Sequence, residues 1–438
     1  MKKRTILISL VLVLCLLLLA GCGRKKKAPV SPLPAGLPVS PAPAAEAEPT
    51  PVPEYNTISS ADKAEIRAVR EELLSVAEAC REVYDGAEKS SALNAVLPDG
   101  DYYAMVARIG SLGCAATDST GRWDMEGAEG LAELCRMIGS GSDCAGTYYV
   151  VYPDGQISAY HLSRRLGEWH LITMSLGWKK GEPEIYSQGQ FVISDVQYTD
   201  KGWLIYNRDT GSFDDNQRSN TTSWVFVRVQ PCDSVKKELC RKYVEPIGYF
   251  ENNLFTTTWS RNNPGPIDFN SLYAYLFGMY HGTEMLSSYN IHSYYTNLPG
   301  TDLYMVPRER FEEVVQYYFD ISSASLINIS DFNSAAGGYF FLGYQSEYYN
   351  VTPRTPEPEV TDYWYNADGS LTLRVDAVNK WYGTDRAFTH ELTVAEYGDG
   401  HFMYLGNTLI DRPENILPEN KLCYLLDLER EKTPYKKA

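Results

Sequence analysis

The hydrophobic positions along the chain first recur with the period of a helix. From Ser59 onward, apolar residues return every three to four positions, which is the spacing of one face of an amphipathic helix. Ser59 and Asp62 form a capping-box-like start, and Gly86 suits the end of this helix. Two shorter helical patterns follow at residues 102–109 and 127–138. The first part of the body is therefore predicted to be helical.

From Gly146 the period shortens to two, which is typical of strands with one buried face. Six or seven such segments lie between residues 146 and 230, and short turns containing Asp-Gly or Lys-Gly join them. Joints this short predict an antiparallel meander, which we expect to pack on the preceding helices. Residues 58–230 are assigned to this first α+β unit.

Helical patterns return after residue 230. Asp233 is a suitable N-cap for a helix, another helix is expected around residues 271–280, and a third within residues 306–319 has Pro307 in its first turn. After Pro358, four alternating segments with Asp-Gly turns predict strands.

The expected fold class is therefore α+β, with N-terminal helices packed on an antiparallel β-meander, followed by a second helix-then-antiparallel-sheet unit. The second unit is assigned to residues 231–430, and residues 431–438 form a polar tail. Whether the two units are separate domains stays open at this point.

The N-terminus carries the pattern of a secretory signal peptide. Three basic residues precede an apolar run from Ile6 to Ala20 that only Ser9 interrupts. A helix of that length rises about 22 Å, less than the roughly 30 Å hydrocarbon core, so a permanent span is disfavoured. Leu19-Ala20-Gly21-Cys22 also resembles the lipobox of bacterial lipoproteins, whose cysteine receives a diacylglyceryl group and becomes the new N-terminus. We expect a signal peptide at residues 1–21 and a lipid on Cys22; an uncleaved anchor and ordinary secretion are the alternatives.

Residues 22–57 read as the lipidated cysteine followed by a basic, proline-rich tether. Arg24, Lys25, Lys26 and Lys27 are expected to contact anionic lipid headgroups, and a solvated spacer is the alternative. The prolines favour extended polyproline II, which would let the tether reach roughly 80 Å. The predicted location is the outer face of the cytoplasmic membrane, with membrane contact through the diacylglyceryl anchor.

Composition narrows the function classes. Removing residues 1–21 would change the formal net charge from −16 to −19, and basic residues cluster only beside the anchor. Nucleic-acid partners are therefore excluded. With 44% hydrophobic and 13% aromatic residues, the chain can bury one large core or two moderate ones. The 33 tyrosines favour a sheet-rich body first and binding surfaces second.

The cysteines give no metal or redox motif. No C-x-x-C spacing occurs, and lipidation of Cys22 would leave an odd number of thiols in the mature chain. Cys135 with Cys144, or Cys232 with Cys240, are near enough in sequence to pair in an oxidising compartment. Cys80 and Cys135 nevertheless lie in the apolar stripes of expected helices, so mostly reduced and buried thiols are favoured.

Several phrases together resemble a known family: RIGSLGCAATD, GWLIYNR, YVEPIGYFENNLFTTTW, VPRERFEEVVQYYFDIS, GTDRAFTHELTV and YLGNTLI. Their order and wording are similar to a family of Gram-positive, Clostridia-type surface lipoproteins known only as a domain of unknown function. The resemblance covers roughly residues 60–410 and implies the anchor and the α+β fold. It brings no activity, cofactor or catalytic residue.

His390-Glu391 begins like a zinc-protease motif, but Val394 stands where the second histidine would lie. The segment also alternates with period two, which places Phe388, His390 and Leu392 on the inward side of a strand. His390 is therefore predicted to be a hydrogen-bonded core histidine.

Three other patterns are weighed and set aside. Ser234 and Lys237 form the S-x-x-K motif of penicillin-recognising enzymes, but the S-D-N and K-T-G elements are absent. Glu312 and Glu313 are predicted to lie on a solvated helix face. Residues 214–216 carry oxygen ligands but lack the spacing of an EF-hand loop. We therefore predict no catalytic residue, no metal site and no cofactor.

Aromatic clusters are the remaining candidate binding feature. In a strand, neighbouring side chains face opposite sides, so one member of each cluster is expected in the core and another at the surface. The clusters are Tyr102-Tyr103, Tyr148-Tyr149, Tyr317-Tyr318-Phe319, Tyr339-Phe340-Phe341 and Tyr363-Trp364-Tyr365.

The sequence thus predicts a lipid-anchored, extracytoplasmic binding or interaction module without catalysis of its own. The proline-rich tether suggests reach toward a cell-wall polymer or another envelope protein. The alternatives are an envelope hydrolase with a site built from distant carboxylates, and a structural envelope lipoprotein.

Overall fold

The structure, a computed structural model, describes residues 60–90, 96–121, 124–208, 223–282, 296–297, 303–342 and 355–418. The first part of the body contains three helices: α2 (Ser60–Gly86), α3 (Asp99–Gly110) and α4 (Glu129–Met137). The predicted helices are confirmed, and α2 ends at Gly86 as its sequence indicates. A short 3-10 turn at Ile138–Ser140 extends α4.

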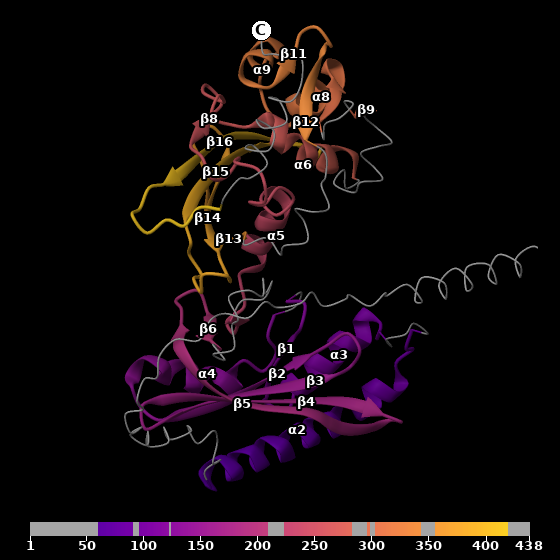
Figure 1. Cartoon of the computed structure of the whole chain (residues 1–438), viewed down its shortest axis with the longest axis vertical. Coiled ribbons are helices and arrows are strands. Elements are labelled where there is room, and N and C mark those ends of the chain that lie inside the picture. Colours follow the sequence, from indigo (N-terminus) through magenta and orange to yellow (C-terminus); the bar gives the residue numbers. More distant parts are fainter. Residues whose placement is uncertain are drawn as a thin grey trace, which may run out of the picture. The chain divides into compact units, whose positions relative to one another are not determined.

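Seven strands then form one sheet in which every strand pairs with its neighbour in chain order (Figure 1). They are β1 (Ala115–Asp118), β2 (Cys144–Val151), β3 (Ile157–Arg165), β4 (Glu168–Lys179), β5 (Glu182–Tyr198), β6 (Trp203–Asn207) and β7 (Trp224–Arg228). From β2 to β7 the pairs are antiparallel, which confirms the predicted meander. The unpredicted edge strand β1 pairs with β2 in parallel.

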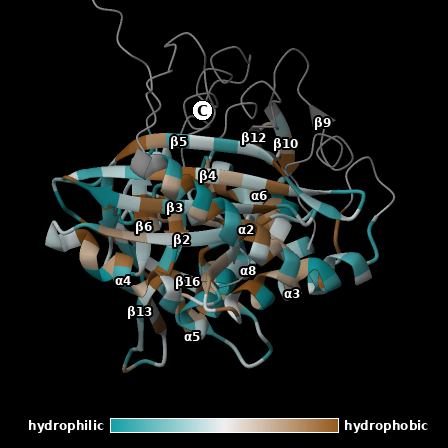
Figure 2. Cartoon of the chain, turned by 90° about the horizontal axis from the view of Figure 1, so that it is seen from below, coloured by the Kyte–Doolittle hydropathy of each residue, from teal (hydrophilic) through white to brown (hydrophobic). Residues whose placement is uncertain are grey.

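Helices cover both faces of this sheet. Hydrophobic and hydrophilic residues follow one another along its strands in Figure 2. One set of inward residues packs under α2 and α3, and the other set packs against α4. Tyr148 and Tyr149 therefore point to opposite faces and are both buried, at 1% and 0% exposure. The expectation that one of this pair is exposed was wrong, because it assumed a sheet with one open face.

The second half alternates short helices with strands. Its elements are α5 (Ser234–Tyr243), β8 (Trp259–Ser260), α6 (Phe269–His281), β9 (Thr296–Asn297), β10 (Leu303–Pro307), α8 (Arg308–Tyr318), α9 (Ser323–Ile329), β11 (Phe332–Asn333), β12 (Gly338–Leu342), β13 (Glu357–Tyr365), β14 (Leu371–Val378), β15 (Thr389–Glu396) and β16 (Phe402–Ile410). Asp233 caps α5 as predicted, since its Oδ1 accepts a bond from the backbone N–H of Lys236 at 3.0 Å.

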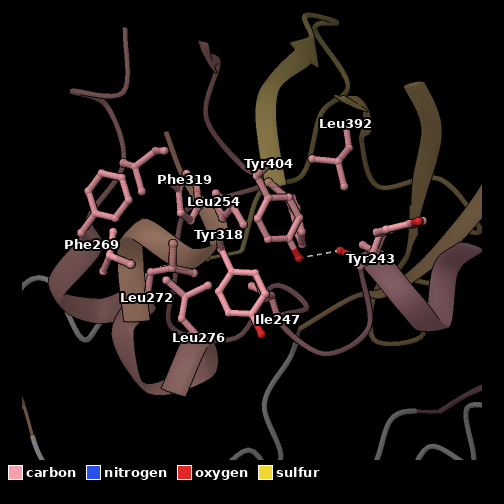
Figure 3. Packing of buried hydrophobic residues seen from close by; sticks show 14 of the residues in the cluster. Tyr243, Ile247, Leu254, Phe269, Leu272, Leu276, Tyr318, Phe319, Leu392 and Tyr404 are labelled. Atoms are coloured by element: carbon pink, nitrogen blue, oxygen red, sulfur yellow. Dashed lines mark hydrogen bonds between the residues drawn. The ribbon is translucent and has the colours of Figure 1, made fainter. Parts of the chain in front are cut away.

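Two sheets organise these elements. The predicted C-terminal strands form an antiparallel sheet in the order β13-β14-β15-β16, and β8 adds to it beside β16. A four-stranded sheet, β11-β12-β10-β9, was not predicted. The α+β class is confirmed. Helices and sheets share a core in which Tyr318, Phe319 and Tyr404 meet, and Figure 3 shows Tyr404 bonded to the backbone of Tyr243.

A buried ion cluster lies where the turn after β5 contacts β13 and β14. The Lys201 Nζ lies 3.6 Å from Glu359 Oε2 and 3.3 Å from Asp376 Oδ2. Arg386 Nε bonds Asp376 at 2.9 Å. Burial opposes ionisation of Asp376, but Lys201, Thr389 and Arg386 hold its pKa below the ordinary value. These contacts lie within the single compact unit formed from residue 58 onward.

The cysteines of the described segments are free thiols: Cys80, Cys114, Cys135, Cys144, Cys232 and Cys240. Cys80 is fully buried, and burial raises its pKa to about 12. Cys135 is 8% exposed. Both pack as small hydrophobes, as the helical pattern predicted.

Candidate functional site

Exposed and half-buried aromatic rings gather at one end of the C-terminal sheet. We define the aromatic surface by five residues: Tyr280, Tyr317, Tyr365, Tyr397 and His401. They come from the end of α6, the last turn of α8, the end of β13 and the turn between β15 and β16. Ring contacts connect four of them, and Tyr365 joins them through a hydrogen bond to Glu396, the neighbour of Tyr397, so remote parts of the sequence build one surface.

The rings of this surface touch in series. The Tyr397 ring stacks on His401 with centroids 5.0 Å apart and planes 18° apart. The Tyr317 ring also contacts His401, with centroids 4.2 Å apart and planes 54° apart. Tyr280 meets Tyr317 edge to face at 5.0 Å. Such arrangements stabilise aromatic groups beyond simple burial and hold their faces in place.

The turn that carries His401 is firmly built. The Tyr397 backbone N–H donates to the His401 carbonyl at 2.8 Å, and the His401 N–H donates to Asp399 Oδ1 at 3.0 Å. Gly400 has φ +87°, a left-handed conformation that favours glycine. The His401 Nε2 donates to the Tyr317 carbonyl at 2.6 Å, which ties the turn to α8.

A carboxylate lies beside the rings, one residue before Tyr397. Glu396 Oε1 accepts bonds from the Tyr243 hydroxyl and, at 3.1 Å, from Lys242 Nζ. Glu396 Oε2 accepts from the Tyr365 hydroxyl at 3.3 Å. The bond from Tyr243 is the main cause that lowers the pKa of Glu396, and the charge on Glu396 raises the pKa of Tyr365. At neutral pH the site therefore holds an ionised carboxylate among neutral tyrosines.

Buried rings support the surface from below. Tyr318 and Tyr243 both pack against Phe402, with centroids 5.7 and 4.8 Å away. Phe402 follows His401 directly, so the turn and the core are joined by consecutive residues. Tyr318 is visible in the core of Figure 3.

Three tyrosines of the aromatic surface are exposed. Tyr317, Tyr397 and Tyr365 are 40%, 47% and 64% exposed. The other large exposed hydrophobic side chains described after residue 230 are Val235, Tyr382 and Leu417. In the cluster Tyr317-Tyr318-Phe319 the first ring is exposed and the others are buried, as predicted.

Sequence reasoning found part of this surface. It singled out the clusters containing Tyr317 and Tyr365, but it missed Tyr280, Tyr397 and Glu396. Aromatic residues on both sides of the turn Gly398-Asp399-Gly400 were the available signal. The predicted lipid and headgroup contacts, Cys22 and residues 24–27, lie outside the described residues and stay predictions.

His390 is a core histidine, as predicted. It has no exposed surface, and its Nδ1 lies 2.7 Å from Asn407 Oδ1 while its Nε2 lies 3.0 Å from the Tyr249 hydroxyl. Asn407 Nδ2 donates to the Phe255 and Thr257 carbonyls, so its Oδ1 must accept from Nδ1. The imidazole is thereby fully bonded within the protein.

The prediction that Glu312 lies on a solvated helix face is wrong. Glu312 is 7% exposed rather than solvated, and its carboxylate accepts bonds from Arg308 Nε at 2.9 Å, the Tyr339 hydroxyl at 2.8 Å and the Ser323 hydroxyl. Arg308 belongs to the same helix, but Ser323 and Tyr339 reach Glu312 from α9 and β12, so the helix pattern alone did not reveal its burial. Glu313 accepts instead from the Tyr280 hydroxyl at 3.0 Å.

Two other constellations have structural explanations. Lys237 of the S-x-x-K motif pairs with Asp124, and Ser234 begins α5. On the first sheet, Thr147 Oγ1 lies 2.9 Å from His161 Nδ1, and His161 Nε2 lies 3.1 Å from Glu65 Oε1. Glu65 belongs to the start of α2, so this chain of bonds attaches that helix to the sheet.

Neither a metal centre nor a spanning helix is found where the structure describes the chain. No group of three or more His, Cys, Asp or Glu residues in the described ranges could hold a metal ion. Within the same ranges, no helix combines the length and apolarity needed to cross a membrane. The loop 214–216, weighed above for calcium, lies outside them.

Comparison with known proteins identifies a family but supplies no activity, ligand or catalytic residue. A protein-family profile without an assigned function matches residues 67–422, which is most of the chain. Neither the curated proteins nor the solved structures contain a match.

Proposed function

Because the chain belongs to DUF6070, a family of unknown function, we propose its role from its own residues: a lipid-anchored, extracytoplasmic module that binds a component of the cell envelope. The family assignment confirms the domain of unknown function expected from the resemblance. Lipoprotein character, Gram-positive origin and envelope location are part of the proposal.

The proposed location at the membrane rests on the N-terminal sequence. The leader is too short for a stable span, and Cys22 follows it in a lipobox-like context. Two acyl chains on one residue give stable anchoring, whereas a single chain holds a protein only marginally. The proline-rich tether would then give the body reach beyond the membrane surface.

The single observation that carries the binding role is the aromatic surface. Exposed rings held by core packing and hydrogen bonds offer contact area at low entropic cost. Burial and the bond to Glu396 raise the pKa of Tyr243, the charge on Glu396 raises the pKa of Tyr365, and the bond from Tyr243 lowers the pKa of Glu396, so each of these three groups keeps its ordinary charge state at pH 7. These groups therefore suit binding better than acid–base catalysis.

The test is co-sedimentation of the full chain, kept in mild detergent, with purified cell-wall fragments. We expect the wild-type protein to sediment and the variant Tyr317→Ala/Tyr397→Ala to stay in solution. Tyr382→Ala is the matched control, because Tyr382 is 48% exposed but lies outside the aromatic surface. Equal sedimentation of all three proteins, or of none, would contradict binding of the wall through this surface. Degradation of the fragments by the wild-type protein would instead favour the envelope hydrolase.

A further inference from the structure

We propose that the aromatic surface binds an uncharged glycan chain, whose sugar rings stack on Tyr317, Tyr397 and Tyr365 while a sugar hydroxyl bonds Glu396. This inference rests on the proposed function and names the class of its ligand.

The type of side chain favours a sugar over a peptide or a lipid. Grooves for helices and acyl chains expose aliphatic residues, which adapt to irregular apolar partners. The exposed large hydrophobic side chains that contact Glu396 or His401 in the described residues are the tyrosines Tyr365, Tyr317 and Tyr397. Exposed aliphatic side chains occur at Val96, Leu112, Leu166, Val192, Val235 and Leu417. Flat rings that carry hydroxyl groups instead match a pyranose, which has a flat C–H face bordered by hydroxyls.

The local charge disfavours an anionic ligand. The ammonium of Lys242 is bonded to Glu396 at 3.1 Å, so these two charges offset each other. Glu313, bonded to Tyr280, adds a negative charge at the edge of the surface. The whole chain carries a formal charge of −16. Polymers rich in phosphate or carboxylate groups would therefore be repelled. The described residues of this surface provide no cluster of unpaired cations to attract them.

The hydrogen-bonding groups have capacity left for a ligand. A carboxylate offers about four lone-pair sites. Among the described residues, only the Tyr365 hydroxyl donates a hydrogen bond to Glu396 Oε2, at 3.3 Å. The side chain of Glu396 is 32% exposed and that of Lys242 is 43% exposed. A sugar hydroxyl could thus donate to Glu396 Oε2 while a neighbouring hydroxyl accepts from Lys242, beside the stacked rings.

Since His401 donates its Nε2–H to the Tyr317 carbonyl, its ring orientation is set before any ligand arrives. Tyr397 is held by the same imidazole through stacking. A preorganised platform loses little side-chain freedom on binding, which suits the shallow, repetitive contact that a polymer of similar units makes.

The experiment is calorimetric titration of the full chain in detergent with chitotetraose and cellotetraose as neutral probes, and with poly(glycerol phosphate) as an anionic one. We expect both tetrasaccharides to bind and the anionic polymer not to bind. Tyr317→Ala and Tyr365→Ala should each weaken tetrasaccharide binding by about tenfold or more, because each removes one stacking ring. Tyr317→Phe keeps the ring and should bind like the wild type.

Two controls separate binding from folding. Tyr382→Ala should leave both affinity and the unfolding midpoint unchanged. Glu396→Gln keeps the size of the side chain. It should reduce the free energy of tetrasaccharide binding by more than it reduces the free energy of unfolding. Wild-type affinity for the tetrasaccharides in both Tyr317→Ala and Tyr365→Ala would overturn the proposal.

The outcomes distinguish this inference from the function it rests on. If wall fragments retain the protein through Tyr317 and Tyr397 but neither tetrasaccharide binds at millimolar concentration, the glycan assignment fails and the binding role stands. If the anionic polymer binds instead, the glycan assignment fails in the same way. If the tetrasaccharides bind but wall fragments do not retain the protein, the glycan assignment stands and the envelope target is wrong.

Discussion

His390 Nδ1 and Asn407 Oδ1 lie 2.7 Å apart in a core where neither residue has any exposed surface. Burial lowers the pKa of His390 from its ordinary 6.5 to about 4, although Asn407 and the charge of Asp376 oppose the shift. The native state therefore keeps this imidazole neutral where the unfolded chain would already be protonated.

Stability should fall as the pH drops from about 6.5 to about 4. In this window the unfolded state binds more protons than the native state, so the free energy of unfolding rises with pH. The total effect of His390 is up to about 3 kcal/mol, present above pH 6.5 and lost as the pH approaches 4. Urea unfolding measured across this range checks it. His390→Gln should flatten the pH dependence and His170→Gln should not, and equal slopes in both variants would contradict the prediction.

Lys201→Met should destabilise the protein by about 3 kcal/mol, because it leaves buried carboxylates with too few partners. Asp376, at 2% exposure, would lose one of its two cationic neighbours. Lys179→Met is the control: its bond to Glu184 joins side chains that are 71% and 53% exposed, so it should cost less than about 1 kcal/mol. Thermal or denaturant unfolding compares the two, and similar losses would show that the Lys201 cluster contributes no more than a surface pair.

Gly155→Ala should cost about 2 kcal/mol more than Gly369→Ala. Both glycines have a positive φ, +80° and +83°, so both variants carry backbone strain. Only at Gly155 would the new Cβ clash, lying 2.6 Å from Tyr84 Cε2, whereas nothing lies within 4 Å of the Cβ at Gly369. The difference in unfolding midpoint isolates the steric part. Equal destabilisation would mean that the Tyr84 ring moves aside freely.

Cys22→Ser should move the protein out of the membrane fraction, since the proposed acyl chains would have no thiol to occupy. Cys232→Ser is the control, because Cys232 is a free thiol in the body of the protein and should leave partitioning unchanged. Mass spectrometry of the mature N-terminus provides the second measurement. An intact leader on the protein recovered from cells would contradict the anchor even if partitioning changed.

Replacing Arg24, Lys25, Lys26 and Lys27 by Gln should weaken binding to anionic vesicles but not to neutral ones. Each basic residue next to such a surface contributes about 1 kcal/mol at low salt. Vesicle sedimentation at low and high salt measures the loss. Equal binding to both vesicle types by the wild-type protein would show that these residues act only as a spacer.

Regular patterns in the sequence were sufficient to predict the long helices and strands. The strands from β2 to β7 alternate and are joined by recognisable turns, and His390 lies on the inward side of β15 because its neighbours Phe388 and Leu392 share its face. A local pattern predicts such features because their partners are adjacent in sequence.

Short elements and remote partners were the features that escaped prediction. The strand β11, Phe332–Asn333, has two residues, too few to show a period. Glu312 is buried because Tyr339 and Ser323 reach it from other elements. The aromatic surface likewise draws Tyr280, Tyr317 and His401 from separate segments, so each residue alone resembled ordinary sheet or helix packing.

The order of strand pairing has a consequence for how the chain folds during synthesis. In the first sheet each strand pairs with the one before it, so the pairings are local in sequence and the sheet can be completed once β7 has emerged. Trp259 of β8 pairs with Asn407 of β16, so this edge must wait until almost the whole chain is available. The first sheet can therefore be folded while the aromatic surface is still being assembled.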